Sequence, residues 1–129
     1  MGSPHPVKII EKVWPVDLAW VVTSNRRVHW SRRYQVQHYH RGMAYVMFRH
    51  PPFTFDRARI TVTFAFPTRR KRDVANLYDL VVKPIVDGIV DAGLLPDDND
   101  THLIGPDIRR GPGPSATGKV SITVRVEEA

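Results

Sequence analysis

Residues that could act together on a phosphate group are concentrated between Arg69 and Asp100, in the run RRKRDVANLYDLVVKPIVDGIVDAGLLPDDND. Asp73 stands at the start of a predicted helix, and Asp97 and Asp98 follow its end, so helix and loop can bring these carboxylates together. Mg²⁺ binds one or two carboxylates, keeps several waters and completes its shell with substrate phosphates. The run is therefore compatible with a magnesium site, although a capping aspartate and a solvated Asp-Asp loop are the commoner explanations of such spacing.

Charges of opposite sign are segregated along the chain. No carboxylate occurs from Leu18 to Phe55, a window that is rich in arginine, and a second basic run directly precedes Asp73. Arginine binds phosphate through two parallel hydrogen bonds, so this pattern predicts a surface for the nucleic-acid backbone, with a merely solvated basic face as the alternative. The residues predicted to contact DNA are Arg26, Arg27, Arg32, Arg33, Arg69, Arg70, Lys71 and Arg72.

Length and composition limit the class of protein. The 129 residues, 42% of them hydrophobic, suffice for one core, so we expect a single domain over residues 1–129. Cysteine is absent, which excludes disulfides and thiolate metal sites and suits a reducing compartment. No apolar run approaches the roughly 20 residues that span a bilayer, and the first residues do not have the pattern of a secretory signal. We therefore expect a cytoplasmic protein without a membrane partner.

Hydrophobic periodicity and turn residues predict six main elements. Ile60, Val62 and Phe64 alternate with polar residues in the clearest strand, and Gly93 is the expected terminator of the second helix. Pro84 falls inside that helix and should kink or split it, because proline lacks a backbone N–H. The predicted strands are Leu18–Val22, Arg59–Pro67, His102–Ile108 and Lys119–Glu127, and the predicted helices are Ser31–Phe48, capped by Ser31, and Asp73–Ala92, capped by Asp73 or Asn76. The order β-α-β-α-β-β predicts an α+β domain with a mixed sheet.

The acidic and basic run resembles the central motif of the RusA family of Holliday junction resolvases. The similar features, in order, are the basic residues before Asp73, Asn76-Leu77, Lys83-Pro84, Asp87 four residues after the lysine, Asp91-Ala92-Gly93 and Asp97-Asp98. Weaker similarity extends to Ser24–Arg27 and to the basic helix that follows. The resemblance implies a homodimeric, Mg²⁺-dependent endonuclease that cuts four-way DNA junctions in recombination and repair. That family is common in phages and prophages, which implies a bacterial or phage-infected cell.

The resemblance also implies roles for particular residues. Asp73 matches the first metal-binding carboxylate of the family and Asp98 the last, with Asp97 beside it, and Lys83 matches the catalytic lysine. Ala75 departs from the family, which has a second metal-binding aspartate two residues after the first. About one helical turn is also inserted before Lys83, and Asp79 lies in it. On a continuous helix Ala75, Asp79 and Lys83 share a face, so Asp79 is either a replacement ligand or a surface residue.

Two functions from different classes follow from these residues. The first is a Mg²⁺-dependent endonuclease, in which Asp73, Asp79, Asp97 and Asp98 hold metal and Lys83 neutralises developing charge. The second is a module that binds branched DNA without cutting it, because Ala75 removes a needed ligand.

Aromatic and histidine residues of the first helix allow further interpretations. Trp30, Tyr34 and Tyr39 lie among arginines and are either core residues or platforms for unpaired bases. His38 and His40 point about 200° apart on a helix and cannot chelate one zinc ion.

Overall fold

Alternation of apolar and polar residues builds the sheet. In β2 (Ala58–Ala65) and β4 (Val120–Glu128) every second side chain is buried, so each strand contributes one apolar face to the core. Both strands agree with their sequence predictions to within two residues at each end. The remaining strands of the computed structural model, which describes residues 7–129, are β1 (Ile9–Val16) and β3 (Leu103–Arg110).

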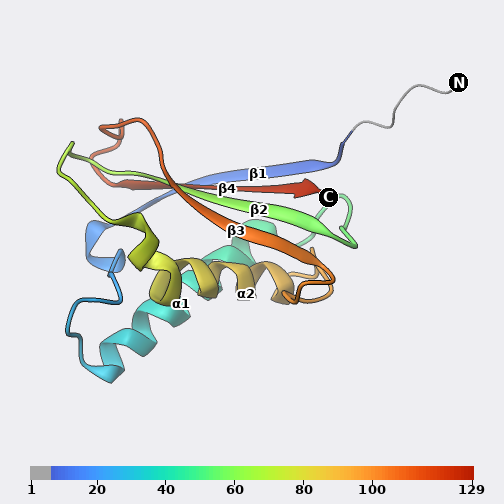
Figure 1. The fold of residues 1–129 in the computed structure, drawn as a ribbon, viewed down its shortest axis with the longest axis horizontal. Helices are drawn as coiled ribbons and strands as arrows, with labels where there is room; N and C mark the ends of the chain where they lie inside the picture. The colour runs from blue at the N-terminus through green and yellow to red at the C-terminus, as the bar shows by residue number, and fades with distance from the viewer. Residues whose placement is uncertain (1–6) are drawn as a thin grey trace, which may run out of the picture.

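The four strands form one mixed sheet in the order β1-β4-β2-β3. β4 lies antiparallel to both β1 and β2, whereas β2 and β3 are parallel. A parallel pair needs a crossover connection, and the chain between β2 and β3 supplies it with α2 (Lys83–Asp91). Both α1 (Trp30–Phe48) and α2 lie on the same face of the sheet (Figure 1). The predicted α+β class, the element order and the mixed sheet are thus confirmed.

The predicted first strand, Leu18–Val22, is wrong. The strand is β1, and the predicted segment instead contains η1, a 3₁₀ turn over Leu18–Trp20. The apolar run misled the prediction because its side chains are not all internal: Leu18 is 42% exposed. β1 was overlooked because it contains Pro15 and charged residues, which an edge strand tolerates since one side of its backbone pairs with no other strand.

The N-cap of α1 also differs from the prediction. His29, not Ser31, occupies the cap position, and its Nδ1 accepts a hydrogen bond from the Ser31 backbone N–H at 3.2 Å. The imidazole thus replaces the hydroxyl or carboxylate oxygen that usually caps a helix.

The second predicted helix is divided into three segments, in agreement with the effect expected of Pro84. A 3₁₀ turn, η2 (Val74–Leu77), leads into a π-helical turn, η3 (Tyr78–Val82), and only then does α2 begin, with Pro84 in its first turn. Proline fits there because the first N–H groups of a helix have no intrahelical partner. Gly93 ends the helix with a φ of +82°, as predicted.

Gly88 allows α1 and α2 to pack closely. A Cβ at this position would collide with the backbone carbonyl of Arg41 and lie 2.8 Å from the Ala44 Cβ. We predict that Gly88→Ala lowers the free energy of unfolding by about 1–3 kcal/mol, because overpacking forces the helices apart. Gly42→Ala, on the exposed side of α1 with nothing within 4 Å, is the matched control and should stabilise the protein by about 1 kcal/mol. Urea denaturation measures both, and equal effects of the two variants would contradict the close packing.

Within residues 7–129, none of the helices has the length and hydrophobicity needed to cross a membrane.

Candidate functional site

A basic cleft of about 440 Å³ lies where the loop after η1 meets the loop after β2. Its cations are Arg26 from the first loop and Arg70, Lys71 and Arg72 from the second. The two loops are held together by a backbone hydrogen bond, in which the Ser24 N–H donates to the Asn76 carbonyl of η2 at 2.9 Å. Residues predicted to bind DNA from two distant parts of the sequence therefore meet at one surface.

The cations of the basic cleft are not neutralised by the protein itself. Within residues 7–129, neither Arg26 nor any of the cations at positions 70–72 forms an ion pair. The Arg72 guanidinium lies 4.5 Å from the centre of the Phe66 ring, and the Arg110 guanidinium lies 5.3 Å from the same ring. Burial first, and then repulsion from Arg70 and Arg110, lowers the pKa of Arg72. A bound anion would relieve this repulsion.

Arg110 was not predicted as part of the site. Parallel pairing of β2 and β3 places Arg110 opposite Phe64, so that it reaches Phe66 just beyond the end of β2. No local signal in the sequence indicates this contact, because it depends on which strand pairs with β2. The Arg72 Nε atom is buried without a hydrogen-bond partner among the described residues.

Asp73 is the acidic member of the basic cleft. It lines the cavity together with Asn76, whose side-chain amide donates to the Asp73 carboxylate at 2.9 Å. Asp73 occupies the cap position of η2 but makes no capping hydrogen bond with its side chain. The predicted helix-capping role of Asp73 is therefore not fulfilled, and its carboxylate is bound by the Asn76 side chain instead.

Lys83 bridges two carboxylates at the start of α2. Its Nζ lies 2.6 Å from Asp87 Oδ1 and 2.5 Å from Asp98 Oδ2. Burial lowers the pKa of Lys83, but the hydrogen bonds to the two carboxylates outweigh this and raise the pKa above its ordinary value. The hydrogen bond from Lys83 in turn lowers the pKa of Asp98. The ammonium thus occupies the place between two carboxylates in which a metal cation would otherwise be favoured.

Asp87 was not predicted as a site residue, although its position four residues after Lys83 indicates a contact between the two side chains. Residues four apart on a helix are neighbours, and Lys83 and Asp87 have that spacing. The contact of Lys83 with Asp98 depends on the loop after α2, and no spacing rule predicts it.

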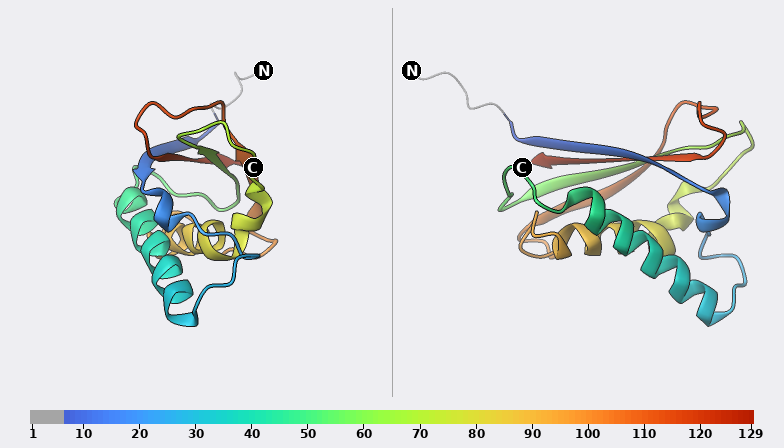
Figure 2. Two further views of the ribbon diagram at one scale, coloured as in Figure 1. Left: turned by 90° about the vertical axis from the view of Figure 1, so that its left-hand side faces the viewer. Right: turned by 180° about the vertical axis from the view of Figure 1, so that it is seen from behind.

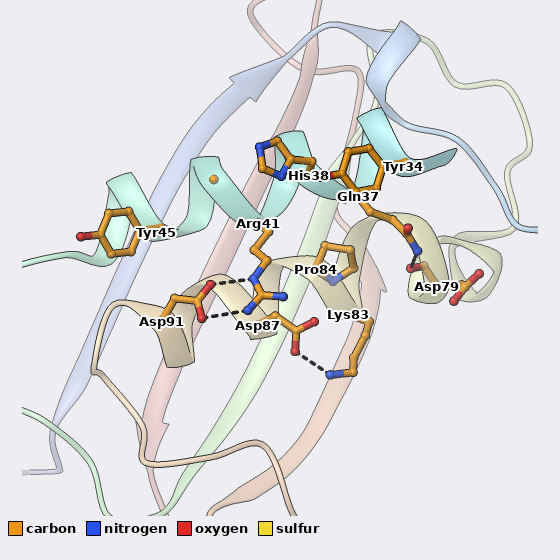
Figure 3. Close-up of a pocket in the computed structure, with 11 residues that line it drawn as sticks. Tyr34, Gln37, His38, Arg41, Tyr45, Asp79, Lys83, Pro84, Asp87 and Asp91 are labelled. Atoms are coloured by element: carbon orange, nitrogen blue, oxygen red, sulfur yellow. Dashed lines mark hydrogen bonds and ion pairs between the residues drawn. The ribbon is translucent and has the colours of Figure 1, made fainter. Parts of the chain in front are cut away.

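Asp79 faces α1 and not the basic cleft. Its carboxylate accepts a hydrogen bond from the Arg33 guanidinium at 2.8 Å. Its backbone carbonyl accepts one from the Gln37 side chain at 3.3 Å, which Figure 3 shows. Together with Lys83 and Asp87 it lines a groove of about 610 Å³ between α1 and α2, which we call the interhelical groove. The π-helical turn is responsible, because it replaces the continuous α-helix on which Ala75, Asp79 and Lys83 would share a face.

Two of the arginines predicted to contact DNA have structural partners. Arg33 is paired with Asp79, and Arg32 donates to the Ala19 carbonyl at 2.7 Å while its guanidinium lies over the Trp20 ring. Arg27 and Arg69 are exposed and belong to the same two loops as the basic cleft. The second ion pair of the interhelical groove joins Arg41 to Asp91 through two hydrogen bonds of 2.6 and 2.9 Å (Figure 3).

The predicted metal ligands are engaged separately. Asp73 accepts from Asn76, Asp79 from Arg33 and Asp98 from Lys83. The Asp97 carboxylate accepts from the Asp98 backbone N–H at 2.7 Å, in the local pattern of a turn. Across residues 7–129, no three histidine, aspartate or glutamate side chains are grouped to hold a metal ion. These residues thus do not fit a preformed shell of three carboxylates around Mg²⁺.

Comparison of the sequence with models of protein families, and with curated proteins, finds no match. The resemblance to the RusA family therefore stays a prediction that rests on the residues between Arg69 and Asp98.

Proposed function

We propose that the protein binds the phosphate backbone of branched DNA through the basic cleft. The observation that carries the proposal is the contact of Arg72 and Arg110 with the same Phe66 ring, since neither guanidinium has an ion-pair partner among the described residues. The two like charges repel each other, and a phosphate is a suitable counterion because arginine donates two hydrogen bonds to it. Exposed cations on the same two loops extend the surface along a backbone.

The choice of branched DNA rests on the resemblance to the junction resolvases. A homodimer belongs to the same proposal, because a four-way junction presents two equivalent strands and a twofold-symmetric dimer presents two equivalent sites. Salt should weaken binding steeply, since each arginine–phosphate contact releases counterions.

Binding without cutting agrees best with the arrangement of the carboxylates. Ala75 offers no ligand at the position of the family's second aspartate, and the Asp79 carboxylate forms an ion pair with Arg33. Lys83 already offsets one of the two negative charges of Asp87 and Asp98, so these two carboxylates attract a further cation less strongly. Each of these contacts would have to break before a shared metal shell could form.

Mg²⁺-dependent cleavage is the second candidate, and the position of Asp73 favours it. Repulsion between Asp73 and a phosphate would oppose simple backbone binding, so a carboxylate in the basic cleft is unfavourable unless a cation bridges the two. Mg²⁺ is commonly held by one or two carboxylates together with substrate phosphates, which is the arrangement this position would allow.

Asp73→Asn distinguishes the two candidates. We predict that the wild-type protein retards a synthetic four-way junction in a gel without nicking it in Mg²⁺, and that Asp73→Asn binds a few-fold more tightly because a negative charge leaves the cleft. Asp100→Asn, an exposed aspartate outside the cleft, is the matched control and should change neither property. Nicking by the wild-type protein that requires Mg²⁺ and disappears in Asp73→Asn would establish the endonuclease.

A further inference from the structure

The first half of α1 projects beyond the rest of the fold, and its aromatic side chains are uncovered. In both views of Figure 2 the start of the helix extends away from the sheet. Trp30 is 74% exposed and Tyr34 is 63% exposed, which is unusual for side chains of this size in a protein with an ordinary core. Neither the basic cleft nor the interhelical ion pairs requires Trp30 at this position.

The uncovered rings form a row on one side of α1. Trp30, Tyr34 and His38 are spaced four residues apart and therefore share a face of the helix, over a length of about 12 Å. The Tyr34 and His38 rings are stacked, with centroids 5.7 Å apart and planes inclined by 13° (Figure 3 shows both). We call these three residues the aromatic row. Tyr34 and His38 cover one face of each other, and the exposed Trp30 ring remains available to a further aromatic ring.

The other aromatic residue predicted to stack on bases, Tyr39, is used internally. Its ring is stacked on the Trp20 ring with centroids 4.4 Å apart. The Arg32 guanidinium also lies over the Trp20 ring. The remaining tryptophan, Trp14, is buried in the core. Among the three tryptophans, only Trp30 can therefore meet a ligand without rearrangement of the fold.

Cations surround the start of the aromatic row. Arg26 and Arg27 line two adjoining clefts beside His29, of about 580 and 450 Å³, and neither arginine has an ion-pair partner within the described residues. Arg26 also lines the basic cleft, so the two clefts beside His29 and the basic cleft share this cation. Aromatic faces beside unpaired arginines are the combination that binds single-stranded nucleic acid, with stacking for the bases and cations for the backbone.

A second copy of the chain is a poorer occupant of this surface. A twofold-symmetric dimer would place the patch against itself, which brings Arg26 and Arg27 of one protomer close to the same residues of the other. Neither of the two clefts that Arg26 and Arg27 line beside His29 contains a carboxylate to offset that repulsion. Charge complementarity therefore favours a polyanion.

We propose that the aromatic row binds unpaired bases, so that the protein prefers branched or single-stranded DNA over a continuous duplex. The inference rests on the proposed function in one respect, since the adjoining basic cleft supplies the backbone contacts. In an intact duplex the base faces are covered by their neighbours, and they become accessible where strands separate. The row thus supplies a physical basis for selecting a branch point, which phosphate contacts alone do not provide.

The test is the affinity of Trp30 variants for a fluorescently labelled single-stranded oligothymidylate and for a duplex without a branch. Trp30→Ala should weaken binding to the single strand roughly tenfold or more, the effect of removing one stacked base, and leave the duplex nearly unaffected. Trp30→Phe should restore most of the loss because it restores a ring. Val46→Ala, which removes another exposed apolar side chain of α1, is the matched control and should bind like wild type.

Fluorescence gives a second readout of the same contact. Binding of oligothymidylate should quench the emission of exposed Trp30, and Trp30→Phe should lose this quenching while it keeps its affinity.

Equal binding of the single strand by wild type and Trp30→Ala would overturn the inference. If the same protein lost junction binding when the arginines of the basic cleft were replaced, the proposed function would still stand. A change from dimer to monomer in Trp30→Ala, without loss of single-strand affinity, would assign the row to self-association instead.

Discussion

Replacement of Arg70 and Arg72 by glutamine should lower the affinity for a four-way junction about 100-fold or more at physiological salt. Each arginine is expected to make a charge-assisted contact with a phosphate, and such contacts contribute about 1.5–3 kcal/mol each. The slope of log affinity against log salt concentration should also become shallower by about 2, since two fewer counterions are released. Fluorescence anisotropy at several salt concentrations measures both quantities.

A matched pair of arginines separates this effect from the loss of net charge. Arg49 and Arg57 are exposed cations without ion-pair partners among residues 7–129, and Arg57 precedes β2 at the end opposite the basic cleft. Arg49→Gln with Arg57→Gln removes the same charge and should weaken binding far less. Equal losses in the two double variants would show that only net charge matters, and the basic cleft would no longer be the binding site.

The unfolding temperature shows whether Arg70 and Arg72 serve DNA binding or the stability of the fold. In the free protein Arg72 is repelled by Arg70 and Arg110, and burial adds to the cost of its charge. The Arg70→Gln, Arg72→Gln variant should therefore unfold at the same temperature as wild type or a higher one, although it binds DNA poorly. A lower unfolding temperature would indicate that the stack on Phe66 holds the fold together.

The second large effect concerns stability at acidic pH. His40 is fully buried in α1, and its Nε2 lies 2.7 Å from the Trp20 carbonyl, to which it donates. Its Nδ1 is buried without a hydrogen-bond partner among the described residues. Burial lowers the pKa of His40 from 6.5 to about 4, although the hydrogen bond to Trp20 acts in the opposite direction. The imidazole is therefore neutral in the folded protein, because a second N–H at Nδ1 would find no acceptor.

The sign of the pH dependence follows from the lowered pKa. Between pH 6.5 and 4 the unfolded chain binds a proton at this histidine that the folded protein does not, so stability falls as the pH falls. The free energy of unfolding should decrease by about 3 kcal/mol across this window and be unaffected by His40 above it. Asp91 and Asp98 have lowered pKa values and lose their contribution at more acidic pH, as their carboxylates become protonated.

Urea denaturation between pH 7 and 4 measures this effect in wild type and in two histidine variants. His40→Phe should be less stable at pH 7, because the buried Trp20 carbonyl loses its donor, but its stability should change little down to pH 4. His38→Gln, which changes the exposed neighbour of the same helix, should retain the full decrease. A wild-type protein whose stability stays constant from pH 6.5 to 4.5 would contradict the buried neutral imidazole. His40 holds η1 against α1, so acid should also loosen the loop that carries Arg26.

The sequence alone determined the elements in which apolar residues recur at the positions that face the core. Alternation of buried and exposed positions predicts β2 and β4, because a strand buried on one face must alternate. Gly93 and Pro84 predict where the second helical segment ends and where it breaks, since both act through the local backbone. Charge segregation likewise predicts a basic surface, and Arg70, Lys71 and Arg72, directly before Asp73, do line the basic cleft.

Only the tertiary structure decided which charges meet. The pairing of Asp79 with Arg33 depends on how α1 packs against the π-helical turn, and the contact of Asp98 with Lys83 depends on the path of the loop after α2. Arg110 reaches Phe66, which lines the basic cleft, through the parallel pairing of β3 with β2. Side chains far apart in the sequence carry no local signal of their neighbours, because their separation in space is decided by the packing of whole elements. The spacing of the carboxylates is compatible with a magnesium site but does not indicate their hydrogen-bond partners, which are Asn76 for Asp73, Arg33 for Asp79 and Lys83 for Asp98.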